Sequence, residues 1–98
     1  MNDYETNSYA VYILECADGT LYTGITNDPP GRLRLHNKGV GAKFTKGRRP
    51  CRMIACMGWY TQGDALRLER LIKSRPRRLK QSTLENFKWG HKVDPLPS

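Results

Sequence analysis

The chain has 98 residues, which is enough for one domain with a single modest core. Lys and Arg number 17 against 9 Asp and Glu, and the net charge is +8. This excess favours a polyanionic partner, most simply nucleic acid. An anionic membrane is the rival partner, and two observations disfavour it. No segment combines a strongly apolar face with a basic one, and no apolar run is long enough to cross a bilayer.

The N-terminus and the cysteines bear on the compartment. The first ten residues, "MNDYETNSYA", are acidic and polar, unlike a signal peptide. Cys16, Cys51 and Cys56 make an odd set without a CxxC pair. Such a set favours buried thiols in a reducing compartment over a disulfide framework. We therefore predict a cytoplasmic protein.

A β-hairpin is predicted near the N-terminus. Residues 9–16 and 20–26 are rich in aromatic and β-branched residues, and "ADG" at 17–19 is a turn. A two-residue loop would place Tyr12 and Tyr22 on opposite faces of the sheet. A three-residue loop, with Gly19 in the left-handed region, would place both on one face, with Tyr12 opposite Gly24. We predict the three-residue loop, because Gly24 leaves space over which the Tyr12 ring can lie.

A short helix is expected over residues 29–37. Asn27 or Asp28 can cap its start, proline suits its first turn, and Gly39 is a natural stop. Arg32 and His36 are four residues apart and therefore share one face of this helix.

The remaining elements alternate with basic segments. A basic, Gly-rich loop at 40–50 precedes a third strand at 51–60 and an amphipathic helix over 65–74, capped by Asp64. Pro76 opens a last helical stretch at 76–87. We predict an α+β fold in the order β-β-α-β-α-α, a three-stranded, mostly antiparallel sheet flanked by helices. Its domain would span 8–87, between a flexible arm at 1–7 and a frayed, basic, Pro-bearing tail at 88–98.

Several motifs occur in a recognisable order. They are "AVY" at 10–12, "YTG" at 22–24, Arg32, His36 and a glutamate, Glu69, in the following helix. This ordered set resembles the GIY-YIG nuclease family, and in particular its small stand-alone members. The first motif has Ala-Val where the family has Gly-Ile, and Thr23 replaces the isoleucine of the second. Both tyrosines and Gly24 are kept, and Gly24 is assigned a structural role at the site.

The resemblance implies catalytic roles for Tyr12, Tyr22, Arg32, His36 and Glu69. Tyr22 would position or deprotonate the attacking water, and Tyr12 would hydrogen-bond that water or the phosphate. Arg32 suits the scissile phosphate, because its planar fork donates two hydrogen bonds and keeps its charge. His36 titrates near neutrality, so it could assist the base or protonate the leaving oxygen. Alternatively, His36 is a solvated histidine at a helix C-terminus.

Glu69 is the predicted metal ligand, for Mg²⁺ or Mn²⁺. Mg²⁺ often takes only one or two carboxylates and completes its shell with water and phosphate oxygens. The plain alternative is a solvated glutamate that pairs with Arg70 or Lys73 on its own helix.

Two basic segments, "GAKFTKGRRP" and "KSRPRRLK", carry most of the positive charge and are expected to contact backbone phosphates. Phe44, Trp59 and Trp89 could stack on an unpaired base, although each is more often a core or anchoring residue. The predicted nucleic-acid contacts are Arg34, Lys43, Lys46, Arg48, Arg49, Arg77 and Arg78.

The sequence thus predicts a metal-dependent endonuclease that hydrolyses DNA phosphodiester bonds, of the kind that acts in repair or recombination. Charge supports only nucleic-acid binding, and the hydrolase assignment rests on the resemblance. Two alternatives remain open: a non-catalytic binding module with the same fold, and a nuclease subunit that needs a partner protein.

Overall fold

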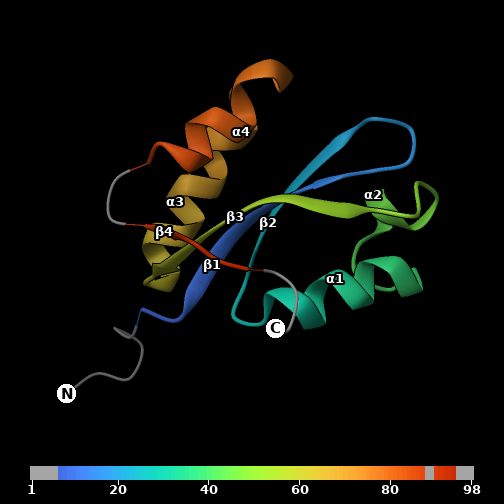
Figure 1. The fold of residues 1–98 in the computed structure, drawn as a ribbon, viewed down its shortest axis with the longest axis horizontal. Coiled ribbons are helices and arrows are strands. Elements are labelled where there is room, and N and C mark those ends of the chain that lie inside the picture. Colours follow the sequence, from blue (N-terminus) through green and yellow to red (C-terminus); the bar gives the residue numbers. More distant parts are fainter. Residues whose placement is uncertain (1–6, 88–89, 95–98) are drawn as a thin grey trace.

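The computed structural model describes residues 7–87 and 90–94. In chain order the elements are β1 (Tyr9–Glu15), β2 (Leu21–Thr26), α1 (Pro29–Lys38), α2 (Lys43–Lys46), β3 (Arg52–Tyr60), α3 (Gln62–Lys73), α4 (Arg77–Glu85) and β4 (His91–Lys92). The sheet has the order β2-β1-β3-β4, and each neighbouring pair is antiparallel (Figure 1). The predicted α+β class is confirmed.

The sheet differs from the prediction at its outer edge, where a fourth strand follows α4. His91 and Lys92 pair with Gly58 and Met57 of β3. The predicted frayed tail is therefore wrong for these two residues. A two-residue strand is too short to produce an alternating pattern, and pairing with the free edge of β3 decides its conformation.

Two smaller predictions in the helical segments are also wrong. The basic loop contains the one-turn helix α2, which a four-residue stretch cannot signal by periodicity. The cap of α3 is Thr61, whose side chain accepts a hydrogen bond from the Asp64 N–H at 3.2 Å. Asp64 lies inside the first turn instead, where a carboxylate also suits the helix dipole.

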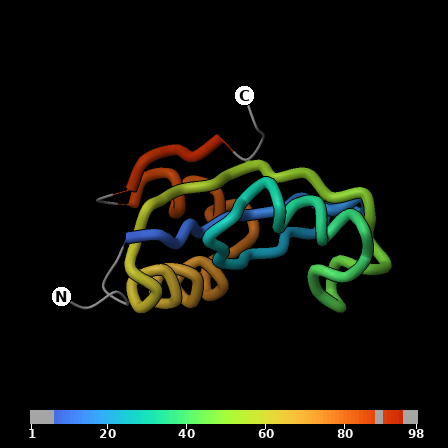
Figure 2. The backbone as a smooth tube through the Cα atoms, turned by 90° about the horizontal axis from the view of Figure 1, so that it is seen from below, coloured from blue at the N-terminus to red at the C-terminus, as the bar shows by residue number. Residues whose placement is uncertain are grey.

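Both faces of the sheet are covered. Val11 and Ile13 pack with Leu68 and Ile72 of α3 and Leu84 of α4. The alternate residues of β1 point to the other face, which lies under α1. The buried members of that second cluster are Ala10, Tyr12, Leu14, Cys16, Cys51 and Cys56. Figure 2 shows α2 at the opposite end of the molecule from the α3–α4 pair.

The hairpin has the predicted three-residue loop. Tyr12 pairs with Gly24 and Leu14 with Tyr22. Cys16 N–H donates to the Thr20 carbonyl at 2.9 Å, which closes the loop, and Gly19 has φ of 84°. Tyr12 and Tyr22 therefore lie on the same face of the sheet, as the turn chemistry predicts.

The boundaries of α1 agree closely with the prediction. The Asp28 side chain accepts from Gly31 N–H, and Gly39 ends the helix in the left-handed region with φ of 85°. All three cysteines are free and buried. Within the described ranges, no helix combines the length and the apolar character needed to cross a bilayer.

Candidate active site

Three aromatic rings form the centre of the candidate site. The ring centroids of Tyr12 and Tyr22 are 6.4 Å apart, and the His36 ring lies 5.8 Å from Tyr12 and 5.1 Å from Tyr22. The two tyrosines come from the hairpin, and His36 comes from the last turn of α1, which covers that face. Hairpin register and helix placement thus bring together residues that are 24 positions apart.

Gly24 makes room for Tyr12. A Cβ atom at Gly24 would lie 2.6 Å from the Tyr12 hydroxyl oxygen and 2.7 Å from Cζ. Such distances are far inside van der Waals contact, so only glycine lets the ring lie across β2 in this way. The structural role expected for Gly24 has a direct steric basis.

His36 is fully buried and bonded through both ring nitrogens. Its Nε2 lies 2.9 Å from the Tyr12 hydroxyl, and its Nδ1 lies 2.8 Å from Thr45 Oγ1. The interpretation of His36 as a solvated histidine is therefore wrong. Its direct protonation of a leaving oxygen is incompatible with this arrangement, because neither ring nitrogen is open to a substrate. Only the role of assisting another residue remains.

Charge around Tyr12 links the hairpin to α1 and α3. Burial chiefly raises the pKa of Tyr12 well above the ordinary value, and Tyr22 and the Glu69 carboxylate raise it further, while Arg32 lowers it. Burial, followed by Arg32, lowers the pKa of His36. Tyr12 and His36 are therefore neutral at neutral pH, and the charges of Arg32 and Glu69 both act on Tyr12.

Arg32 is poised for an anionic partner. Its guanidinium is partly exposed, and among residues 7–87 and 90–94 it has no hydrogen-bond or ion-pair partner. Arg32 and Arg34 line one open hollow of about 390 Å³ on α1, together with Lys38. Although Arg34 lies two positions further along the helix, both arginines thus border the same hollow.

Glu69 reaches the site from α3 and is largely buried, with a side-chain exposure of 17%. Its Oε2 forms an ion pair with Lys73 Nζ at 2.7 Å, the pairing that the plain alternative anticipates. The described part of the chain holds no cluster of three or more potential metal ligands. The second oxygen of the Glu69 carboxylate lies outside the ion pair with Lys73. A single carboxylate oxygen suits a cation that is bound mainly through water and substrate oxygens.

The sequence of the chain matches a known catalytic domain. Residues 8–83 match the model of the GIY-YIG catalytic domain, which covers most of the chain. The chain belongs to the GIY-YIG family. The small GIY-YIG proteins to which it is similar are named UPF0213 proteins, and their names state no activity.

Two of these GIY-YIG relatives illustrate the similarity. A UPF0213 protein of Streptococcus agalactiae is 41% identical over 78 residues, which is 80% of this chain and 89% of the relative. One from Haloquadratum walsbyi is 46% identical over 85 residues, 87% and 91% of the two chains. The solution NMR structure of a UPF0213 protein from Bacillus halodurans is 43% identical, covers 76% of this chain and 79% of its own, and has a TM-score of 0.48.

Three of the seven predicted nucleic-acid contacts of this GIY-YIG domain bind other parts of the protein. Arg48 donates to Asp18 and to the Phe44 carbonyl, and Arg49 donates to the Lys46 carbonyl. Arg77 donates twice to the Gly19 carbonyl, at 2.7 and 3.1 Å. Arg48 joins the hairpin turn to α2 and Arg77 joins it to α4, while Arg49 ties the loop after α2 back to that helix, so all three contribute to the fold.

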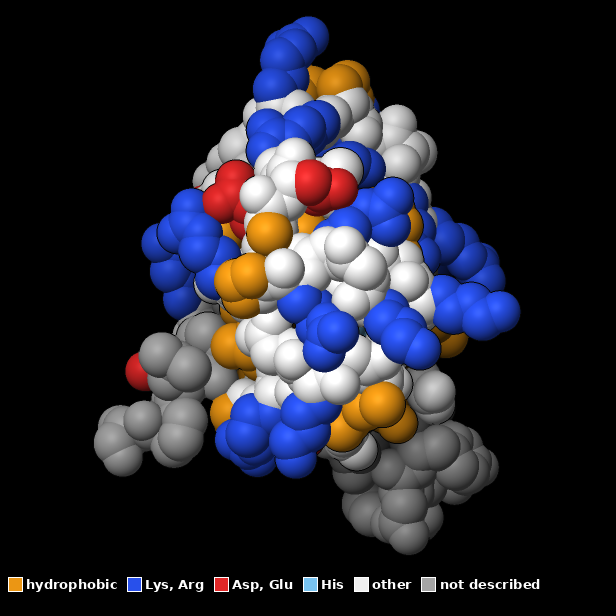
Figure 3. Space-filling model, turned by 90° about the vertical axis from the view of Figure 1, so that its right-hand side faces the viewer, with side chains coloured by type: hydrophobic (Ala, Val, Ile, Leu, Met, Phe, Trp, Pro, Cys, Tyr) orange, Lys and Arg blue, Asp and Glu red, His pale blue; other side chains and the backbone are white. Residues whose placement is uncertain are grey.

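The other four predicted contacts have no such partner within the described residues. They are Arg34, Lys43, Lys46 and Arg78. Figure 3 views the hairpin-turn end, where Lys and Arg side chains are spread widely and far fewer acidic side chains are visible. The four unpaired cations are therefore the better candidates for phosphate contacts.

The sequence did not predict that Phe44, Thr45 and Gly41 lie at the candidate site. The Phe44 ring stacks on Tyr22 with centroids 5.9 Å apart, and the Arg48 guanidinium lies 4.1 Å from the Phe44 centroid. Thr45 is fully buried against His36. The only sequence signal for these residues is the "GAKFT" segment, in which two small residues and a lysine precede the aromatic residue and the threonine.

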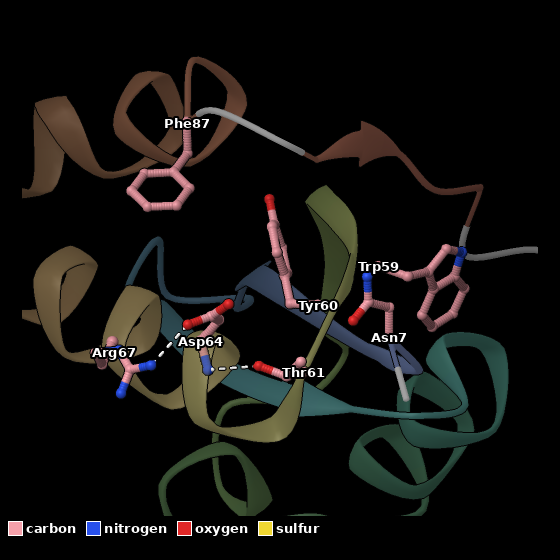
Figure 4. Close-up of a pocket in the computed structure, with 7 residues that line it drawn as sticks. All are labelled: Asn7, Trp59, Tyr60, Thr61, Asp64, Arg67 and Phe87. Carbon is pink, nitrogen blue, oxygen red and sulfur yellow. Dashed lines mark hydrogen bonds and ion pairs between the residues drawn. The ribbon is translucent and has the colours of Figure 1, made fainter. Parts of the chain in front are cut away.

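A second hollow, of about 300 Å³, lies beside the start of α3 (Figure 4). Tyr60 and Phe87 border it, and Asp64 and Arg67 form an ion pair at its rim. None of the five predicted catalytic residues lines it. Trp59 borders this hollow, whereas Trp89, the remaining aromatic candidate for base stacking, is outside the described residues.

Proposed function

We propose that this protein is an endonuclease that hydrolyses phosphodiester bonds in DNA with the help of a divalent cation. The observation that carries the proposal is the convergence on the Tyr12 hydroxyl. Tyr22 and His36 pack beside it, and Arg32 and Glu69, from two different helices, act on it electrostatically. A core with only a packing role would have no need for a cation and a carboxylate at the same hydroxyl.

Tyr22 is proposed as the group that positions or deprotonates the attacking water. Its ring is partly exposed, and its hydroxyl has no hydrogen-bond partner among the described residues. Tyr12 is a poorer base, because burial raises its pKa and its hydroxyl already bonds to His36. His36 acts through Tyr12, since its ring has no open nitrogen.

Arg32 is proposed to hold the scissile phosphate. Arg32 lines the hollow on α1, which neither tyrosine lines, and its charge also acts on Tyr12, so it is the residue that connects an anion bound at α1 with the tyrosine pair. A guanidinium fork can donate two hydrogen bonds to one phosphate, and it stabilises the charge that grows on the phosphoryl oxygens in the transition state.

Glu69 would hold the divalent cation, Mg²⁺ or Mn²⁺. When bound, such an ion supplies charge stabilisation at phosphoryl oxygens and lowers the pKa of bound water. Lys73 holds the carboxylate in place through the ion pair at 2.7 Å. The largely buried position of Glu69 on α3 keeps its orientation fixed before any substrate arrives.

Variants that remove single groups test this proposal. Tyr22→Phe deletes only the hydroxyl, and Glu69→Gln keeps the shape of the side chain but removes its charge. We expect both to lose at least about 100-fold in cleavage rate, in keeping with the loss of a general base or of metal-assisted charge stabilisation, and to keep binding DNA. Cleavage of single-stranded, duplex and branched DNA would be measured in Mg²⁺ and in EDTA.

Matched controls are available on neighbouring elements. Tyr9→Phe makes the same deletion at the start of β1, and Glu85→Gln neutralises a carboxylate at the end of α4, and both should cleave like the wild type. Binding by the wild-type protein without cleavage of any substrate would instead favour a non-catalytic module. Cleavage that appears only with an added protein would favour a nuclease subunit.

A further inference from the structure

The hydroxyl of Thr45 occupies the far end of the hydrogen-bond chain that starts at Tyr12. Thr45 lies in α2 and is fully buried. Its Oγ1 lies 2.8 Å from His36 Nδ1, and its hydroxyl donates to the Ala42 carbonyl at 3.2 Å. The chain of contacts thus runs from Tyr12 to His36, then to Thr45, and ends on a backbone oxygen that can only accept.

Because the hydrogen-bond chain ends on a carbonyl oxygen, the donor and acceptor of each earlier hydrogen bond in the chain are determined. A hydroxyl has one proton, and Thr45 gives its proton to Ala42. Thr45 Oγ1 must then accept from His36, so the proton of the neutral imidazole is on Nδ1. The bare Nε2 must accept in turn, and its partner at 2.9 Å is the Tyr12 hydroxyl, which therefore donates.

We infer that Thr45 is a positioning residue that fixes His36 as its Nδ1–H tautomer and so makes the Tyr12 oxygen solely a hydrogen-bond acceptor toward the candidate site. With its proton committed to His36, Tyr12 can bind a donor such as water. It cannot donate to a phosphate oxygen, which is itself only an acceptor. This inference rests on the proposed function. It selects the attacking water, and not the phosphate, as the ligand of Tyr12.

The surroundings keep the His36 ring in this arrangement. Gly41 passes so close that a Cβ atom there would lie 2.6 Å from Nδ1 and 2.7 Å from Cγ. The Tyr12 and Tyr22 rings pack against the imidazole from the sheet side. The ring is therefore confined, and the protein rather than solvent selects its tautomer.

The charges near His36 and Tyr12 keep the donor pattern in place. Burial and the Arg32 guanidinium lower the pKa of His36, which disfavours a second proton on Nε2. Burial also holds the Tyr12 proton in place, because it raises the pKa of the phenol. Two charged groups act on Tyr12 from the elements packed around it: Arg32 from α1 and Glu69 from α3. Tyr12 therefore remains a neutral hydrogen-bond acceptor for water.

The tautomer can be measured without any substrate. Nitrogen NMR of protein labelled in its histidines separates a protonated from a bare ring nitrogen, and His91→Gln leaves His36 as the only histidine. We expect Nδ1 protonated and Nε2 bare in this background and in Thr45→Ser, which keeps the hydroxyl. Thr45→Val, which removes the acceptor, should populate the Nε2–H form. Thr83→Val makes the same change in α4 and should leave the tautomer unaltered.

Two results would overturn the inference: an Nε2–H tautomer in the background protein, or an unchanged tautomer in a folded Thr45→Val variant. If Thr45→Val does not fold, the tautomer of the background protein decides alone. In cleavage assays we expect Thr45→Val to lower kcat by at least about tenfold, since misplacing a reacting group by 1 Å can cost about 100-fold. KM should change little, and Thr45→Ser should restore kcat.

The two readouts separate this inference from the proposed function. A protein that cleaves nothing but shows the expected tautomers contradicts only the nuclease proposal. A protein that cleaves DNA with the Nε2–H form of His36 contradicts only the role of Thr45. An equal loss of kcat in Thr45→Ser and Thr45→Val would also contradict it, because the serine retains the hydroxyl.

Discussion

Gly24 determines how the two tyrosines can share one site. Tyr12 crosses β2 at this position, and its hydroxyl continues to His36. A glycine inside a strand usually weakens the strand, so its presence here needs a local reason. The close approach of the phenol supplies that reason, and it ties the conformation of an edge strand to the placement of a buried hydroxyl.

Gly24→Ala is therefore expected to destabilise the protein. The new methyl would lie 2.6 Å from the Tyr12 oxygen, and the ring cannot move away without breaking its bond to His36. We expect a loss of about 1–3 kcal/mol in the free energy of unfolding, typical of overpacking, with cleavage reduced as Tyr12 shifts. Urea denaturation measures the first effect.

Gly47→Ala is the matched control for this substitution. A Cβ atom at Gly47 would meet nothing within 4 Å, and its φ of −90° is accessible to alanine. Its stability should stay within about 0.5 kcal/mol of the wild type. Equal stability for the two variants would mean that Tyr12 does not depend on the space above Gly24.

At the level of elements, the hairpin turn is held by α4. Arg77 opens this helix and donates two hydrogen bonds to the Gly19 carbonyl, while its guanidinium also lies 3.5 Å from a Glu15 oxygen. The turn and the helix are 58 positions apart in sequence. This contact fixes the end of the hairpin relative to the α3–α4 side of the sheet.

Arg77→Ala and Arg78→Ala should therefore differ, although the residues are adjacent. Arg77→Ala is expected to lower the free energy of unfolding by about 0.5–1 kcal/mol, the lower part of the range for hydrogen bonds because the side chain is largely exposed. Arg78 has no partner among the described residues, and its variant should stay within about 0.5 kcal/mol. Thermal unfolding compares them, and equal shifts would contradict a role for Arg77 in the fold.

Local chemistry made some elements predictable from sequence and left others hidden. Gly19 and Gly24 determined the hairpin register, and Asp28 and Gly39 marked the ends of α1, because each acts on its own backbone or on the nearest partner. The strand β4 was not predictable, since two residues pair there only because β3 offers a free edge.

The same distinction holds within the site. The resemblance to GIY-YIG proteins named the tyrosines, Arg32, His36 and Glu69, but it gave no sign of Thr45. The contact between His36 and Thr45 depends on the turn after α1 and on the close passage of Gly41, which no periodic pattern encodes. The burial of His36 was likewise hidden, because a histidine in the last turn of a short helix ordinarily faces solvent.

For the whole molecule, the charge of +8 matters through its distribution. Some arginines serve the fold, such as Arg48 and Arg77, while others project without a partner in the described ranges. Net charge therefore overstates the number of cations free for phosphate contacts. Nucleic-acid affinity should depend on the unpartnered set more than on total charge.

The salt dependence of DNA binding tests this distribution. Each phosphate contact contributes about 0.7–0.9 to the slope of log K against log salt concentration. We expect Arg34→Ala to reduce that slope by about 1, because Arg34 borders the hollow beside Arg32. Arg67→Ala removes the same charge from α3, where Arg67 pairs with Asp64, and should leave the slope almost unchanged. Equal effects would show that binding follows total charge alone.

The bond between His36 and Thr45 has a consequence for the segment between them. Surface connections in most proteins tolerate added or deleted residues. Here the histidine ring spans from α1 to α2 and fixes the path of the eight intervening residues, from Asn37 to Phe44. In a library of length variants, an insertion at Val40 should therefore abolish cleavage even where the chain still folds, whereas sequence changes at that exposed side chain should be accepted.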